Sequence, residues 1–166
     1  MPVDSFKWLP RSLAGYYQAM QVAREDPVPW APLRKPLSEC RVAAVTTAGI
    51  HVEGVEPPFD AERERRHPTW GDPTFRIIAS DVRQERIGAS HLHINNDDLL
   101  ADVNVCLPVD RLHDLCARGE IGSVAPRHLS FMGFQLDDRE WRRRYAPEAA
   151  ALLGADRVDC VLLTPV

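Results

Sequence analysis

Short runs of β-branched and aliphatic residues, separated by segments with helical spacing, constrain the fold of this chain most. Residues 41–50 and 158–164 are such runs, and residues 75–79 form a shorter one. The segments 108–118 and 138–153 carry apolar residues at helical spacing and have turn or capping residues at their ends. This alternation predicts an α/β fold, a single-domain, layered and mostly parallel sheet flanked by helices.

The last strand has a special place in this prediction. Residues 158–164 are almost entirely apolar, so we expect a buried strand with Cys160 inside it. In open α/β sheets, ligands bind just beyond the carboxyl ends of the strands. The full set of predicted strands is 41–47, 74–79, 90–94, 129–132 and 157–164, and the predicted helices are 12–24, 108–118 and 138–153.

The first forty residues differ in composition from the rest. They hold six of the fourteen prolines, four of them between residues 27 and 36. Each proline lacks a backbone donor and restricts its predecessor, so this stretch cannot be regular structure. We therefore predict an N-terminal helix and an extended proline-rich arm over residues 1–40 and an α/β domain over residues 41–166. The arm either packs on its own domain or reaches a partner subunit.

Composition excludes several classes of function. The net charge of −4 gives no electrostatic reason to expect nucleic acid or an anionic membrane as a partner. No apolar run approaches the roughly 20 residues of a membrane span, and an export signal is not recognisable. The four cysteines are scattered and contain no C-x-x-C pair. These features predict a cytoplasmic protein with reduced thiols.

The densest group of reactive side chains lies between residues 90 and 133. A strand over residues 90–94 would place His91 and His93 on one face, about 6.6 Å apart. His128 lies near the start of another predicted strand. Imidazoles so placed can share a substrate, a proton relay or a metal, for which zinc or iron would be suitable. The three histidines are our candidate catalytic residues, and a structural role is the alternative.

A turn after the first strand is the candidate substrate-binding element. Thr46 and Thr47 carry hydroxyls that can donate to an anion, and Gly49 allows a positive φ. The Thr-Thr-Ala-Gly sequence matches neither the P-loop nor the dinucleotide fingerprint, so a purely structural turn remains open. The long polar connection at residues 51–73 is expected to be functional or a covering flap. We interpret its charge run, residues 60–66, as a solvated face.

Several longer motifs point to a known family. From Ser90 the chain reads S-H-L-H-I-N-N-D-D-L-L-A-D-V-N-V-C-L-P-V-D-R-L, from Gly119 it reads G-E-I-G-S-V-A-P-R-H-L-S-F-M-G, and from Val158 it reads V-D-C-V-L-L-T-P-V. With P-L-S-E-C-R-V-A-A-V-T-T-A-G-I-H and G-D-P-T-F-R, these motifs cover most of residues 36–166. In order and spacing, the chain resembles the selenoprotein B family of glycine, sarcosine, betaine and D-proline reductases.

The resemblance implies a chemistry and a nucleophile. Family reductases cleave a carbon–nitrogen bond by attack of a selenolate on the α-carbon. Selenocysteine or cysteine is expected directly after the segment that matches Leu163–Val166, and no bound cofactor is expected. A selenocysteine codon read as a stop, degeneration to a binding protein, or deliberate truncation would each explain a product of 166 residues.

The resemblance also implies roles for the candidate residues. His91, His93 and His128 would protonate the leaving group, orient the substrate carboxylate or stabilise the nucleophile. Thr46 and Thr47 would bind the carboxylate. The expected partners are a small-molecule amine substrate and either partner reductase subunits or further copies of the chain.

Three hypotheses follow. The chain is a component of a selenoprotein B-type reductase that acts on a small amine or amino-acid-like substrate and lacks its nucleophile in this form. Alternatively, it is a metal-dependent enzyme that uses His91, His93 and His128, or a non-catalytic binding or assembly subunit. Because Cys160 lies in a strand that we expect to be buried, it is no substitute for the nucleophile.

Overall fold

The computed structural model describes residues 7, 10–11, 14–15, 31–133 and 135–166. The chain forms two units, Met1–Pro32 and Leu33–Val166. In the first unit the Ala14 N–H donates a hydrogen bond of 2.9 Å to the Pro10 carbonyl oxygen. Most of the predicted helix at 12–24, and the prolines at 27 and 29, lie outside the described residues. The division at residue 40 therefore stays a prediction.

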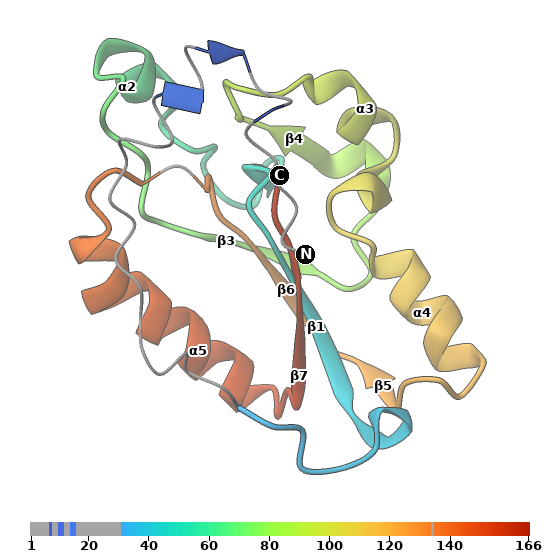
Figure 1. Ribbon diagram of the computed structural model, residues 1–166. Coiled ribbons are helices and arrows are strands. Elements are labelled where there is room, and N and C mark those ends of the chain that lie inside the picture. The colour runs from blue at the N-terminus through green and yellow to red at the C-terminus, as the bar shows by residue number, and fades with distance from the viewer. Residues whose placement is uncertain (1–6, 8–9, 12–13, 16–30, 134) are drawn as a thin grey trace. The chain divides into compact units, whose positions relative to one another are not determined.

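The second unit is built on a mixed sheet with β1 (Arg41–Thr46) at its centre. On one side β1 pairs in parallel with β5 (Ser123–Val124) and β6 (Arg127–Ser130), and β3 (Arg76–Ala79) lies antiparallel beyond β6. On the other side β1 pairs in parallel with β7 (Cys160–Thr164) over five residue pairs. The predicted α/β fold with a mostly parallel sheet is thus confirmed (Figure 1).

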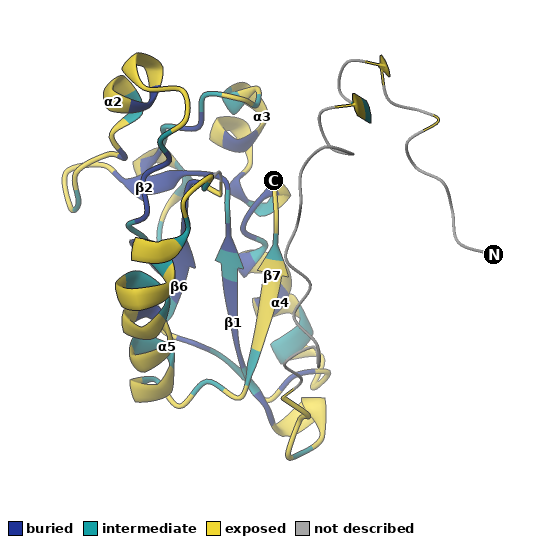
Figure 2. Cartoon of the chain, turned by 60° about the vertical axis from the view of Figure 1, so that its left-hand side comes forward, coloured by how far each residue is buried: buried dark blue, intermediate teal, exposed yellow. Residues whose placement is uncertain are grey.

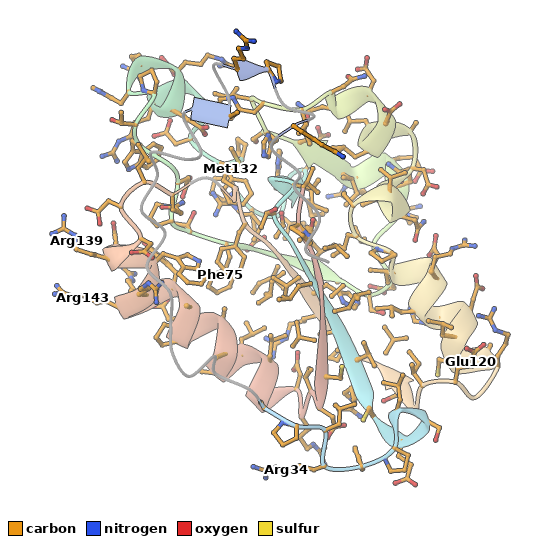
Figure 3. All side chains as sticks on the ribbon, viewed as in Figure 1. Arg34, Phe75, Glu120, Met132, Arg139 and Arg143 are labelled. Atoms are coloured by element: carbon orange, nitrogen blue, oxygen red, sulfur yellow. The ribbon has the colours of Figure 1, made fainter. Side chains whose placement is uncertain are left out.

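Helices cover the two faces of this sheet (Figure 1). Because side chains alternate along a strand, Val42 and Ala44 face the helix α4 (Val109–Ala117), whereas Val45 faces the helix α5 (Ala146–Ala155). Phe75 lies on the α5 side of the sheet (Figure 3). A π-helical turn, Trp141–Tyr145, leads into α5.

The helices predicted at 108–118 and 138–153 are confirmed, and the second ends two residues later than predicted. Gly119 has φ +74° and follows α4, as expected for a residue that ends a helix. Gly154 does not end α5, which continues to Ala155. The residue with a left-handed backbone after α5 is Arg157, with φ +56°.

A smaller layer of structure gathers where β1, β6 and β7 end (Figure 1). It contains the antiparallel pair β2 (Ile50–Val52) and β4 (Ile87–Ala89) and the short helices α2 (Ala61–Arg66) and α3 (Asn96–Ala101). Three 3-10 turns complete the described elements, at Leu37–Glu39, Gln84–Arg86 and Val103–Val105. None of the described helices has both the length and the apolar character of a membrane span.

The prediction of a buried last strand is wrong. Along β7 the side chains of Val161, Leu162 and Leu163 are 38%, 39% and 69% exposed. Figure 2 shows β7 exposed beside the buried β1. The reason is that β7 is an edge strand, which pairs only with β1 among the described residues. Cys160 is accordingly only half-buried.

The prediction of a strand over residues 90–94 is also wrong. The strand β4 ends at Ala89, and the chain then turns through residues 90–95. Two contacts enforce the turn. The Ser90 N–H donates to the Gly49 carbonyl oxygen, and the Asn95 side chain caps α3 by accepting from the Asp97 N–H. His91 and His93 therefore lie in a loop.

Candidate functional site

The carboxyl ends of β1, β6 and β7 are tied together by hydrogen bonds. The Phe131 N–H donates to the Thr46 carbonyl oxygen at 2.9 Å, and the Gly49 N–H donates to the Phe131 carbonyl oxygen at 2.8 Å. The Thr46 hydroxyl donates to the Thr164 carbonyl oxygen at 3.1 Å. The three strand ends therefore form one rigid edge, which is where α/β sheets hold their ligands.

The chain beyond β7 is held at this edge by Thr47. The Val166 N–H donates to Thr47 Oγ1 at 2.9 Å, and the Thr47 hydroxyl lies 3.4 Å from the Val166 carbonyl oxygen. Thr47 thus fixes the backbone of Val166 at this edge of the sheet.

A cavity of about 460 Å³ opens beside these residues. Its apolar wall is formed by Val45, Phe131, Trp141, Leu163 and Pro165, and its polar side chains are Thr47, Gln135, Asp138 and Thr164. The rings of Phe131 and Trp141 pack edge to face with their centroids 6.1 Å apart. A mostly apolar wall with few polar groups is typical of small-molecule sites. We call this space the strand-end cavity.

The predicted substrate-binding residues occupy different positions at this edge. Thr46 is fully buried, and its hydroxyl also accepts from the Ala48 N–H at 3.2 Å. Thr47 is the threonine that lines the strand-end cavity. Gly49 has φ +63°, and a Cβ placed on it would lie 3.3 Å from the His91 N atom. Gly49 therefore lets the His91 loop approach the strand ends closely.

His91 and His93 are brought together by this loop. Their ring centroids lie 5.9 Å apart, and the ring planes are nearly perpendicular, at 86°. The backbone N–H of His93 donates to His91 Nδ1 at 3.1 Å. His91 lines a second cavity of about 500 Å³ between the start of α2 and the start of α3, together with Phe59, Ser90 and Asn96. We call this space the histidine cavity.

Burial decides the protonation of His91. The ring is 7% exposed, and burial lowers its pKa, with a smaller lowering from the charge of His93. His91 is therefore a neutral ring at neutral pH. Because its Nδ1 accepts the His93 N–H, its own hydrogen sits on Nε2.

His128 does not lie with the other two histidines. It is fully buried in β6, and its Nδ1 accepts the Ala44 N–H of β1 at 2.9 Å. The imidazole thereby replaces a backbone acceptor at the break between β5 and β6. Burial lowers the pKa of His128 to about 4, so the ring is neutral. Its contacts are those of a core residue of the sheet.

A three-ligand metal site is not built from these residues. In the part of the chain that the structure describes, no group of three or more His, Cys, Asp or Glu side chains is placed to hold a metal ion. The nearest acidic partner of the pair is Glu64, whose Oε1 lies 3.2 Å from His93 Nε2. Because structural zinc sites have four protein ligands and catalytic sites have three, His93 and Glu64 fall short of both sets.

Sequence reasoning missed one residue that lines a cavity, Trp141, and one that contacts His93, Glu64. Trp141 lies within the predicted helix 138–153, and helical spacing does not reveal that it lines the strand-end cavity. Glu64 belongs to the charge run that we interpreted as a solvated face, yet it is 3% exposed. That interpretation is wrong for Glu64, because α2 folds back on the His93 loop. No spacing in the run distinguishes it from Glu62.

Comparisons with known proteins point to one family of reductase subunits. The family described as Glycine/sarcosine/betaine reductase selenoprotein B matches residues 12–166. The D-proline reductase subunit gamma of Acetoanaerobium sticklandii is 32% identical over 150 residues, which cover 90% of this chain and 58% of that protein. The Glycine reductase complex component B subunit gamma of Carboxydothermus hydrogenoformans is 27% identical over 139 residues, or 84% of this chain and 31% of that protein.

The chain thus spans 58% and 31% of the lengths of these two relatives. No solved structure matches it. The family match extends over nearly the whole chain and includes both cavities, so the chain belongs to the glycine/sarcosine/betaine reductase selenoprotein B family.

Proposed function

We propose that this chain is a component of a selenoprotein B-type reductase complex and carries the site at which a small amine or amino-acid-like substrate loses its nitrogen. Membership of the family and the names of the two relatives, both subunits of reductases, support this proposal. The strand-end cavity would hold the substrate, with Trp141 and Phe131 against its carbon skeleton.

The observation that carries the proposal is the hydrogen bond from the Val166 N–H to Thr47 Oγ1 at the rim of the strand-end cavity. A selenocysteine or cysteine at position 167 would begin at this rim. A nucleophile must be exposed and ionised, and the mouth of a cavity meets the first condition. A selenolate meets the second at neutral pH without a strong base.

The proposed step is a displacement at carbon. The selenolate forms a bond to the α-carbon as the carbon–nitrogen bond breaks, and the nitrogen leaves with the electron pair. Its departure needs prior activation, by permanent positive charge or by a carbonyl group of a partner subunit. His93 is the candidate proton donor to the leaving group, and His91, a neutral ring with hydrogen on Nε2, would donate a hydrogen bond to the substrate carboxylate.

Alkylation tests the position of the nucleophile. The chain is extended with the downstream codons, with selenocysteine or cysteine at position 167, treated with iodoacetamide and analysed by mass spectrometry. We expect fast labelling at position 167 and no turnover by the 166-residue form. Cys160 should be labelled more slowly, because its half-buried side chain packs against the core on the α4 side of the sheet. Fast, histidine-dependent labelling of Cys160 in the 166-residue form would overturn the proposal and make this short chain a thiol enzyme.

A non-catalytic assembly subunit is the second candidate, and one observation favours it. The edge strand β7 presents Val161, Leu162 and Leu163 to solvent, and apolar edges of this kind are typical association surfaces. Turnover by the extended chain together with its partner subunits would exclude this candidate. Complex formation without turnover would support it.

A further inference from the structure

The short helix α2 buries a single acidic side chain. Its N-terminus is fixed by Asp60, whose Oδ1 accepts the Arg63 N–H at 2.9 Å. Within the helix Glu62 and Arg66 form an exposed ion pair at 3.2 Å. Glu64, by contrast, is 3% exposed and turns inward to the loop that carries His93.

This burial is unfavourable for Glu64 by itself. Its Oε1 has His93 Nε2 as a partner at 3.2 Å, but Oε2 is buried and receives no hydrogen bond from the residues that the structure describes. A buried carboxylate with half of its acceptor capacity unused costs folding free energy, and a polar core position of this kind calls for another explanation. Stability of the fold does not explain why a glutamate is here.

The loop of residues 90–95, which carries His91 and His93, supplies that explanation. The His93 ring lies between Glu64 and His91, edge-on to the His91 ring, and the backbone N–H of His93 donates to His91 Nδ1. The Asn96 side chain donates to the His91 carbonyl oxygen at 2.9 Å and so fixes the loop from the other side. The order Glu64, His93, His91 thus runs from the one buried side chain of α2 to the histidine cavity.

We propose that Glu64 is the positioning residue of the histidine pair. Its carboxylate accepts the hydrogen of His93 Nε2, which selects one tautomer of the ring and holds the ring against His91. When the pair carries an extra proton, the same carboxylate balances the positive charge. A carboxylate that orients an imidazole in this way improves acid–base catalysis without touching the substrate. The catalytic part of this inference rests on the proposed function, in which the histidine pair assists the departure of the leaving group.

Three variants separate orientation from packing. Glu64→Gln keeps the size of the side chain and removes the charge, whereas Glu64→Asp keeps the charge and shortens the side chain. Glu62→Gln changes an exposed glutamate of the same helix and serves as the matched control. Each variant is first checked by thermal unfolding, and Glu64→Asp remains informative if Glu64→Gln does not fold.

The first measurement is independent of activity. Nitrogen-15 NMR of the histidine rings in the isolated chain reports which ring nitrogen carries hydrogen. We expect His93 to carry hydrogen on Nε2 in the parent chain, in Glu62→Gln and in most molecules of Glu64→Asp, and to populate both tautomers in Glu64→Gln. An unchanged His93 signature in Glu64→Gln, or hydrogen on Nδ1 in the parent chain, would overturn the inference.

The second measurement uses the extended chain assembled with its reductase partners. We expect Glu64→Gln to lower kcat by about tenfold to a hundredfold with little change in KM. This is at or below the lower end of the roughly 10²–10⁴-fold ascribed to a general acid itself, because Glu64 acts only through His93. Glu64→Asp should recover part of this loss. Glu148→Gln changes a glutamate in an exposed ion pair with Arg144 that lines neither cavity, and it should match the parent. If Glu64→Gln alters the tautomer but not kcat, the positioning role in catalysis is wrong. Absence of turnover in the parent complex would instead refute the proposed function.

Discussion

The Ala44 N–H of the central strand donates its hydrogen bond to the side chain of His128, at 2.9 Å from Nδ1, and not to a backbone carbonyl. A histidine that we predicted to be catalytic is thus part of the bonding between β1 and β6. The chain breaks the ladder at residues 125–126, between β5 and β6, and the imidazole fills the missing acceptor position. Removal of this acceptor should therefore affect stability first.

We predict that His128→Leu lowers the free energy of unfolding by about 1–3 kcal/mol, the cost of a buried donor without a partner. His128→Gln retains an acceptor and should lose clearly less. Urea unfolding at neutral pH measures both. Equal losses in the two variants would mean that the hydrogen bond to Ala44 is unimportant.

Acid should destabilise the protein through the same residue. The folded pKa of His128 is about 4, below the ordinary value of about 6.5, so the unfolded state binds the proton more readily. The stabilisation by neutral His128 is complete above pH 6.5 and is lost as the pH falls to about 4, by about 3 kcal/mol in all. Unfolding of His128→Gln between these pH values should be less steep, although His51 and His91 act in the same direction. Parallel pH profiles of the parent and the variant would contradict this prediction.

Thr47→Val should weaken the attachment of Val166, which follows β7, to the edge of the sheet. The substitution keeps the shape of the side chain but removes the oxygen that accepts the Val166 N–H. Because this is an exposed hydrogen bond, we expect a loss of about 0.5–1 kcal/mol, seen as faster hydrogen exchange of the Val166 amide. Thr47→Ser keeps the hydroxyl and should exchange like the parent. Slow exchange in Thr47→Val would show that Thr47 does not hold the end of the chain.

Gly49→Ala should be destabilising and should displace the His91 loop. The left-handed backbone at φ +63° costs about 1–2 kcal/mol for an alanine, and the new Cβ would crowd the His91 backbone. Met132 packs against the same position, at the end of the sheet where Figure 3 labels it. Gly154→Ala is the control, since open space surrounds it within α5 and helix propensity favours alanine by up to about 1 kcal/mol. Similar stabilities of the two variants would contradict the close approach.

We expect the exposed side chains of β7 to contribute more to binding of partner subunits than to the free energy of unfolding. Leu162 is 39% exposed and does not line the strand-end cavity, so Leu162→Lys should change the free energy of unfolding by less than about 1 kcal/mol. It should nevertheless weaken binding to partner subunits, measured by co-purification. Val55→Lys alters a side chain that is 68% exposed and lies away from β7. Equal binding by both variants would exclude the edge of β7 as an interface.

The sequence by itself determined the elements whose pattern is local. The β-branched and aliphatic runs predicted β1, β3 and β7, and helical spacing predicted α4 and α5. The strand predicted at 129–132 is β6, which lies two residues earlier, at Arg127–Ser130. The order of motifs also identified the family. The smaller layer with β2, β4, α2 and α3 was missed, because these elements have three to six residues and too short a repeat to recognise.

Only the tertiary structure decided how these elements use their side chains. Apolarity cannot distinguish a central strand from an edge strand, so the exposure of β7 depended on which strands pair with it. The H-x-H spacing located His91 and His93 together but in the wrong element, because contacts with Gly49 and the cap of α3 turn the chain there. His128, a candidate for the site, accepts a backbone hydrogen bond within the sheet. Glu64, expected on a solvated face, is buried beside His93. Such contacts join residues far apart in sequence, where the period of a single element carries no information.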